Sequence, residues 1–142
     1  MAPETYTIAD IAQITGLSSR TIRTYRKMGL LEGTLQNGTW TFTQEQVGKL
    51  LEEPYVKGAM EAKRNAIWTD FLQDTGKQIP SLCTAADFPV TDSQGAKALL
   101  DRLLEQLPAG VQMNYCYDPH RNLVRIHLSG PKALVLPVLT AL

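Results

Sequence analysis

The side chains best suited to bind a polyanion lie between Ser18 and Met28. This segment contains four cationic residues and no acidic one, although the whole chain has 14 Lys and Arg against 14 Asp and Glu. At helical spacing, Arg20, Arg23 and Lys27 share one side of the segment. A guanidinium group suits both guanine edges and phosphate oxygens. The sequence therefore predicts a local basic face that binds nucleic acid, in a chain without a general positive field.

Two cysteines and two histidines are the other residues with chemical potential. Cys83 and Cys116 are far apart and form no Cys-x-x-Cys pair, which is typical of a reducing cytoplasm rather than of a disulfide scaffold. A structural metal site needs about four ligands, and a nucleophilic cysteine needs an adjacent base. In the hairpin expected below, Cys116 does not lie opposite His127, and His120 lies in a turn. We therefore predict no metal, no cofactor and no catalytic residue.

The basic face is expected on the second of two short helices. Thr7 stands at an N-cap position, and apolar residues recur at helical spacing until Thr15 and Gly16 end the first helix. Ser18 or Ser19 caps the second helix, which spans 20–28. A pair of helices joined by so short a turn is typical of a helix-turn-helix, whose second helix enters the major groove.

The other side of the second helix is expected to face a core. Ile22 and Tyr25 are inward by helical spacing, and Met28 is a further candidate. Gly29 stands where a left-handed residue would end the helix. The segment therefore separates an apolar side from a basic side.

A wing and a third helix are expected to complete this domain. Residues 34–43 alternate weakly around Asn37-Gly38, a dipeptide that favours the positive φ angles of a tight hairpin turn. Thr43 then caps a short helix that runs to Leu51. Together these elements predict a winged helix-turn-helix over residues 1–53.

The order of these residues also resembles the N-terminal signature of MerR-type regulators. The resemblance covers about residues 6–51 and rests on four runs, 6–12, 15–18, 21–25 and 29–31. It implies a winged-helix domain that binds double-stranded DNA as a dimer at a pseudo-palindromic site and controls transcription through DNA distortion. In this resemblance Thr21, Arg23 and Tyr25 match the recognition-helix pattern.

Residue chemistry and resemblance together give the candidate DNA contacts. They are Ser18, Ser19, Arg20, Thr21, Arg23, Thr24, Tyr25, Lys27, Asn37 and Trp40. Trp40 stands where wings of the MerR type usually have an arginine. Two interpretations of Trp40 stay open, namely packing over the base of the wing and stacking on nucleic acid.

The middle of the chain is expected to be a linker helix over residues 54–76. Pro54 suits its first turn and Gly76 its end. Its apolar stripe, which includes Val56 and Ile67, fits either an intramolecular core or a contact within a dimer. Residues 77–90 contain two prolines and are expected to be irregular.

The last part of the chain, residues 77–142, is expected to be a small domain with one helix and one β-hairpin. A Leu-rich helix begins at Asp92 or Ser93 and ends before Pro108. The residues on both sides of the loop 119–122 alternate between apolar and polar types. The tail 131–142 contains Pro137, so a bent helix and a short strand both stay open.

Alternation also fixes the register of the hairpin. For both apolar sets to face one core, Tyr117 must lie opposite Val124. Cys116 then lies opposite Arg125, and Asn114 lies opposite His127. A small apolar pocket between the hairpin and the Leu-rich helix leaves open an unidentified small-molecule effector.

The sequence therefore predicts an α+β protein with three parts. Residues 1–53 form a winged helix-turn-helix, 54–76 a linker or dimerisation helix, and 77–142 a domain for dimerisation or effector binding. No apolar run approaches the roughly 20 residues of a membrane span, so we expect a cytoplasmic protein without a membrane partner. The leading function is sequence-specific DNA binding for transcription control as a homodimer. The alternatives are an excisionase-like architectural DNA binder and a protein-interaction module that has lost DNA binding.

Overall fold

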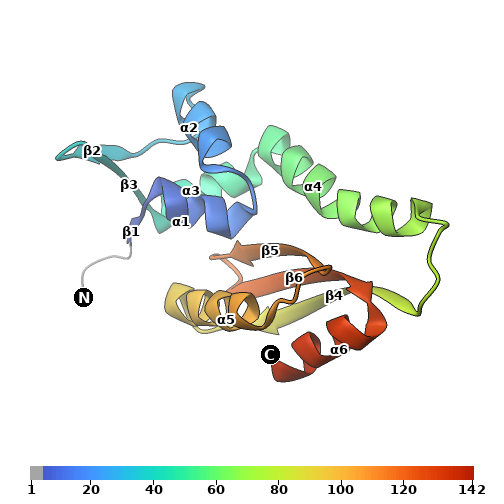
Figure 1. Ribbon diagram of the computed structural model, residues 1–142. Coiled ribbons are helices and arrows are strands. Elements are labelled where there is room, and N and C mark those ends of the chain that lie inside the picture. The colour runs from blue at the N-terminus through green and yellow to red at the C-terminus, as the bar shows by residue number, and fades with distance from the viewer. Residues whose placement is uncertain (1–4) are drawn as a thin grey trace. The chain divides into compact units, whose positions relative to one another are not determined.

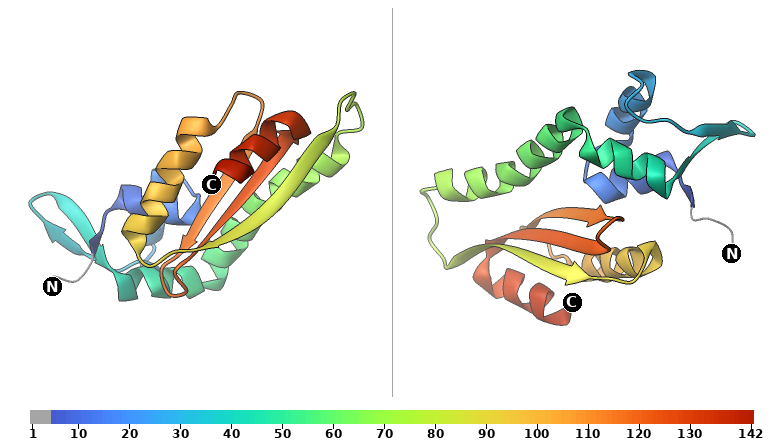
Figure 2. Two further views of the ribbon diagram at one scale, coloured as in Figure 1. Left: turned by 90° about the horizontal axis from the view of Figure 1, so that it is seen from below. Right: turned by 180° about the vertical axis from the view of Figure 1, so that it is seen from behind.

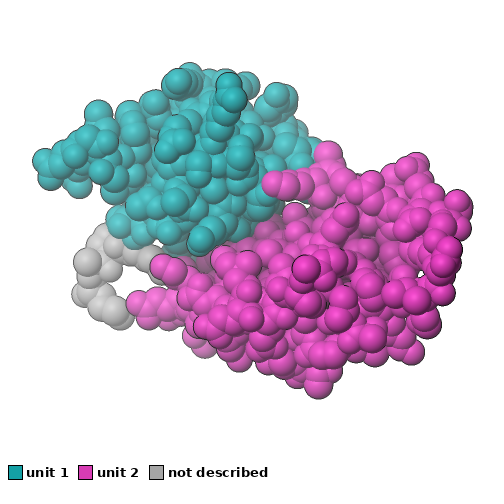
Figure 3. Space-filling model, in the orientation of Figure 1, with its two compact units in different colours: residues 1–61 teal, residues 62–142 magenta. Residues whose placement is uncertain are grey.

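The computed structural model describes residues 5–142, so residues 1–4 of the expected first domain lie outside the described part of the chain (Figure 1). The chain forms two compact units that divide between Glu61 and Ala62 (Figure 3). This division falls inside one continuous helix, α4 (Pro54–Gln73). Each unit is α+β, as the sequence predicted.

The first unit combines three short helices and the beginning of a fourth with a small sheet. Its elements are β1 (Thr5–Tyr6), α1 (Ile8–Thr15), α2 (Ser19–Lys27), β2 (Thr34–Gln36), β3 (Thr39–Thr43), α3 (Gln44–Glu52) and the first part of α4. The strands form an antiparallel sheet in the order β1-β3-β2. The expected hairpin turn is confirmed, because Asn37 and Gly38 have φ angles of 52° and 78°.

Local side-chain bonds explain where helices α1 and α3 begin. The Thr7 hydroxyl accepts a hydrogen bond from the Asp10 backbone N–H, and the Asp10 carboxylate accepts one from the Thr7 N–H. Thr43 and Gln46 make the same reciprocal pair at the start of α3. Such pairs satisfy backbone donors that have no partner within the helix. The predicted N-caps Thr7 and Thr43 are therefore confirmed.

The core of the first unit collects apolar residues from its helices, from β3 and from the segment between α2 and β2. Its fully buried members include Ile11, Ile22, Leu31, Phe42, Val47, Leu50 and Val56. Met28 is more than half exposed and does not belong to this core. Met28 is the C-cap residue of α2, and the left-handed Gly29 follows it. At this position the helical periodicity that turns Ile22 and Tyr25 toward the core no longer sets where a side chain points.

The second unit is a three-stranded antiparallel sheet with helices on both faces. Its elements after α4 are β4 (Ser81–Pro89), α5 (Ser93–Gln106), β5 (Gln112–Asp118), β6 (Leu123–Pro131) and α6 (Lys132–Ala141). The strand order is β4-β6-β5. Helices α5 and α6 lie on one face, and the part of α4 that belongs to this unit lies on the other (Figures 1 and 2).

Strand β4 corrects the expectation that residues 77–90 are irregular. Nine residues of this segment pair with β6, from Ser81 opposite Pro131 to Pro89 opposite Leu123. Pro80 precedes the strand and Pro89 ends it, and β4 lies at the edge of the sheet. Prolines are tolerated at strand ends and at edges because no second partner needs the missing N–H. The expected hairpin is thus part of a three-stranded sheet.

The predicted hairpin register is confirmed. Tyr117 lies opposite Val124, and Cys116 lies opposite Arg125. The apolar set faces α5, where the Tyr115 hydroxyl donates a hydrogen bond of 2.9 Å to the Ala96 carbonyl. The buried residues on this side of the unit include Ala96, Leu99, Leu100, Leu103, Tyr115, Tyr117, Val124, Ile126, Leu128, Val135 and Val138.

The tail of the chain is helical, which decides between the two alternatives for residues 131–142. Pro137 lies inside α6, where it lacks the N–H that would bond to the Ala133 carbonyl. Val135 and Val138 are buried and hold the helix to the unit. The free energy gained by burying these two valines offsets the loss of the one backbone hydrogen bond that proline cannot make.

Candidate nucleic-acid interface

Helix α2 presents the basic face that the sequence predicted. Arg20, Arg23, Thr24 and Lys27 are exposed, and none of the three cations forms an ion pair with a described residue. The Thr24 hydroxyl donates to the Arg20 carbonyl at 3.0 Å. This bond keeps the Thr24 side chain close to the helix surface. The side chains of Arg20, Arg23 and Lys27 are longer and extend furthest from α2.

The start of α2 explains the roles of the serines and of Thr21. Ser18 is the N-cap, because its hydroxyl accepts a hydrogen bond of 3.1 Å from the Thr21 N–H. The two hydroxyl oxygens also lie within hydrogen-bond distance, at 2.9 Å. Ser19 is the first helical residue and is half-buried. The structure thus selects Ser18 from the two predicted caps and places all three hydroxyl residues at the positive end of the helix.

The opposite side of α2 is fixed in the core of the first unit. Ile22 is fully buried, and Tyr25 is almost so. The Tyr25 ring packs edge-on against Tyr55, with 6.0 Å between ring centroids and 82° between planes. Burial, with a smaller effect of Tyr55, raises the pKa of Tyr25 above its ordinary value. Tyr25 therefore lies where helical spacing predicted, in the core, and we leave it out of the surface contacts that the resemblance implied.

The wing has a polar tip and an aromatic base. Asn37 is exposed at the turn, whereas Trp40 is half-buried on β3. The guanidinium carbon of Arg26 lies 4.1 Å from the centroid of the Trp40 ring. A cation at this distance is attracted by the negative face of the indole. Trp40 therefore packs at the base of the wing, against the last turn of α2.

The charge around α2 and the wing is almost entirely positive. Between Asp10 and Glu45 the only acidic residue is Glu32. In the same stretch lie all four cations of the 18–28 segment. A surface of one sign attracts a polyanion and raises its rate of association.

Arg26 is the residue whose position the sequence did not predict. Its charge was evident, but its contact with Trp40 depends on where β3 lies relative to the last turn of α2. The only hints in the sequence were an arginine in the expected last turn of the second helix and a tryptophan after the Asn-Gly turn. Neither residue indicates the other by its spacing along the chain.

The reactive side chains of the second unit do not form a chemical centre. Burial raises the pKa of the Cys116 thiol to about 11, and burial with the nearby Arg64 and Arg125 lowers the pKa of His127. Asp87 accepts two hydrogen bonds from Arg125, at 2.7 and 2.9 Å, which lower the pKa of the carboxyl group. Within residues 5–142, no three His, Cys, Asp or Glu side chains are grouped so that they could hold a metal ion.

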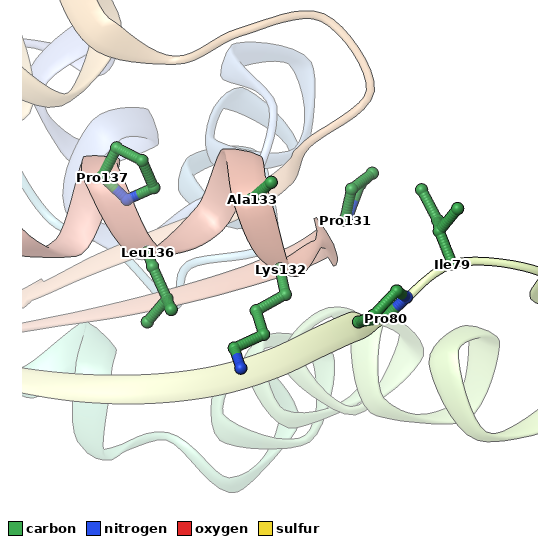
Figure 4. Close-up of a pocket in the computed structure, with 7 residues that line it drawn as sticks. All are labelled: Ile79, Pro80, Pro131, Lys132, Ala133, Leu136 and Pro137. Carbon is green, nitrogen blue, oxygen red and sulfur yellow. The ribbon is translucent and has the colours of Figure 1, made fainter.

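A shallow apolar groove lies on the second unit, between α6 and the segment that leads into β4. It measures about 590 Å³ and is lined by Ile79, Pro80, Pro131, Lys132, Ala133, Leu136 and Pro137 (Figure 4). The sequence left room for an effector elsewhere, between α5 and the hairpin. The groove lies at a different place on this unit from the expected effector pocket.

Comparison with known proteins agrees with the geometry of the first unit. Residues 6–52 match the family described as MerR HTH family regulatory protein, which confirms the resemblance for this segment. Searches of the curated proteins and of the solved structures found no match. Among the described residues, no helix has the length and apolar character needed to cross a membrane.

Proposed function

Because residues 6–52 form a MerR-type helix-turn-helix DNA-binding domain, we propose that the protein is a sequence-specific regulator of transcription that inserts α2 into the major groove. One observation carries the proposal. Helix α2 is fixed on one side by buried Ile22 and Tyr25, and its other side presents Arg20, Arg23 and Lys27, which form no ion pair within the described part of the chain. A rigid helix with free cationic donors is what major-groove binding requires.

The exposed residues divide between two kinds of contact. The N-terminal residues of a recognition helix contact base edges, so Arg20 and Arg23, one turn apart, are the proposed base-reading pair. Lys27 and the hydroxyl groups at the helix start bind phosphates, which fix the register of the protein on DNA. Asn37 at the wing tip is a further phosphate contact.

We also propose that the protein acts as a cytoplasmic homodimer whose contact lies beyond the wing. Residues 54–76 would serve as linker and 77–142 as the dimerisation or effector domain. The support is the number of large apolar side chains exposed after residue 70, namely Leu72, Ile79, Leu104, Leu134 and Leu136. Of these five, Ile79 and Leu136 line the same apolar groove, and contiguous apolar surface of this kind marks interaction sites. A closed dimer has two-fold symmetry, so its DNA site would be pseudo-palindromic.

Selection of bound sequences from a random duplex pool tests the proposed function. We expect enrichment of a two-fold symmetric site whose half-sites are read by α2. Variants Arg20→Ala and Arg23→Ala should each relax preference at one base-pair position per half-site if they read bases. Lys49→Gln, on α3 and already paired with Glu45, is the matched control. The absence of both enrichment and salt-dependent binding would favour a protein-interaction module instead.

A further inference from the structure

Arg26, at the end of the proposed recognition helix, contacts the wing through its guanidinium group. Arg26 lies in the last turn of α2, and its guanidinium group stacks over Trp40 of β3 with 4.1 Å between the guanidinium carbon and the ring centroid. Both residues are half-buried. The tryptophan therefore holds the plane of the guanidinium group in one orientation, which a flexible surface arginine does not have.

The hydrogen-bond donors of this guanidinium group have no acceptor among residues 5–142. Arg26 makes no side-chain hydrogen bond or ion pair with any residue in the described range, and its Nε is buried without a partner. A guanidinium group has five N–H donors in a fixed plane. The buried Nε is closed to an acceptor from outside the protein, whereas the terminal N–H groups of Arg26 are not among the buried atoms and have no partner among the described residues, so an outside acceptor would bind there. Because Arg26 is only half-buried, such an acceptor has access to it.

We propose that Arg26, oriented by Trp40, is a further DNA contact and donates to a backbone phosphate beside the wing. This proposal rests on the function proposed above. A phosphate is the expected acceptor because Arg26 is at the C-terminal end of α2, whereas base edges are read from the N-terminal end of such a helix. A phosphate also takes two parallel hydrogen bonds from the free edge of a stacked guanidinium group. Trp40 is then a positioning residue, which acts through Arg26.

Salt dependence of binding distinguishes a phosphate contact from a merely structural contact. Binding to a fluorescent random duplex is measured by anisotropy from 50 to 200 mM NaCl for wild type, Arg26→Gln, Arg26→Lys, Trp40→Leu and Trp40→Phe. Lys49→Gln is the control, since Glu45 already balances that cation. Circular dichroism checks the folding of every variant.

The Arg26 variants test the charge of the guanidinium group, and the Trp40 variants test how that group is oriented. Arg26→Gln should lower the slope of log affinity against log salt by about 0.9, so that a fourfold rise in salt weakens it roughly 3.5-fold less than wild type. Arg26→Lys should keep the wild-type slope, because the charge stays. Trp40→Leu should bind more weakly at every salt concentration, and Trp40→Phe, which keeps an aromatic face, should recover most of that loss.

The result that overturns this inference differs from the one that overturns the proposed function. Wild-type protein without salt-dependent binding would overturn both. Wild-type binding with an unchanged slope in folded Arg26→Gln would overturn the Arg26 contact alone. If Arg26→Gln does not fold, dicarbonyl modification of wild-type arginines with and without duplex decides the matter by mass spectrometry. Protection of Arg26 by duplex supports the contact, and equal modification overturns it.

Discussion

Replacing Ile22 and Arg23, two neighbours on α2, should separate folding from binding. The Ile22 side chain is fully buried, whereas Arg23 is exposed and forms no ion pair with a described residue. Ile22→Ala should therefore destabilise the first unit. Arg23→Ala should leave its stability within about 0.5 kcal/mol of wild type, as surface changes usually do.

The magnitude for Ile22→Ala follows from the three carbon atoms it removes. At about 0.8 kcal/mol for each buried methylene-sized group, the lost transfer free energy is about 2.4 kcal/mol. The cavity adds to this, and such substitutions cost roughly 2–5 kcal/mol in total. In a unit of this size each kcal/mol lowers Tm by about 4–8 °C, so we expect a fall of at least about 10 °C. Ile22→Val, which removes one carbon, should cost only about 0.5–1.5 kcal/mol.

Two assays on the same three variants test this prediction. Thermal unfolding followed by circular dichroism gives Tm, and anisotropy on a selected duplex, well below the Tm of each variant, gives affinity. Arg23→Ala should lose about 1–3 kcal/mol of binding free energy if it reads a base, or about one unit of salt slope if it binds phosphate. An Arg23→Ala protein that binds as tightly as wild type with the same slope would refute the assignment of α2 as the recognition helix. An Ile22→Ala protein with wild-type Tm would refute the packing argument.

Three further predictions concern the second unit. Sedimentation equilibrium at micromolar concentration should give a homodimer, and a monomer throughout that range would contradict the proposed assembly. The Arg125 hydrogen bonds lower the pKa of Asp87, so the stability that this pair contributes is present above the ordinary carboxyl pKa of about 3.9 and is lost as pH falls through the lowered value. Urea unfolding from pH 5 to pH 2.5 should therefore show a smaller acid loss for Asp87→Asn than for wild type, and parallel curves would count against the pair. With a pKa of about 11, Cys116 should react with a maleimide at pH 8 much more slowly than a free thiol. In the Cys83→Ser variant, Cys116 is the only thiol left, so the measured rate is that of Cys116. Reaction as fast as that of a small thiol would disprove the burial argument.

Features with local causes were predictable from the sequence. The caps at Thr7 and Thr43 depend on residues three positions away, and the Asn37-Gly38 turn depends on its own backbone preferences. The hairpin register followed from alternation across a four-residue loop, since a shift by one residue would turn every apolar side chain outward.

Features with distant causes were not predictable. Strand β4 contains weakly apolar residues between two prolines, and its partner strand lies beyond a whole helix in the chain. The contact between Arg26 and Trp40 requires the Trp40 ring of β3 to lie beside the last turn of α2, although the two residues are 14 positions apart in the chain. For α6, the apolar tail with Pro137 allowed either a bent helix or a short strand, and the burial of Val135 and Val138 in the unit accompanies the helix that forms.

The strand order β4-β6-β5 also has a consequence for how the second unit folds. Asp118 and Leu123, which pair at the end of the hairpin, are 5 residues apart, whereas Pro89 and its partner Leu123 are 34 residues apart. Closing a short loop loses less chain entropy than closing a long one. We therefore expect β5 and β6 to pair early and β4 to be added last, after α5 has formed. Until that step, one side of β6 is an open strand edge that could pair with a second chain, so association during refolding should rise with protein concentration.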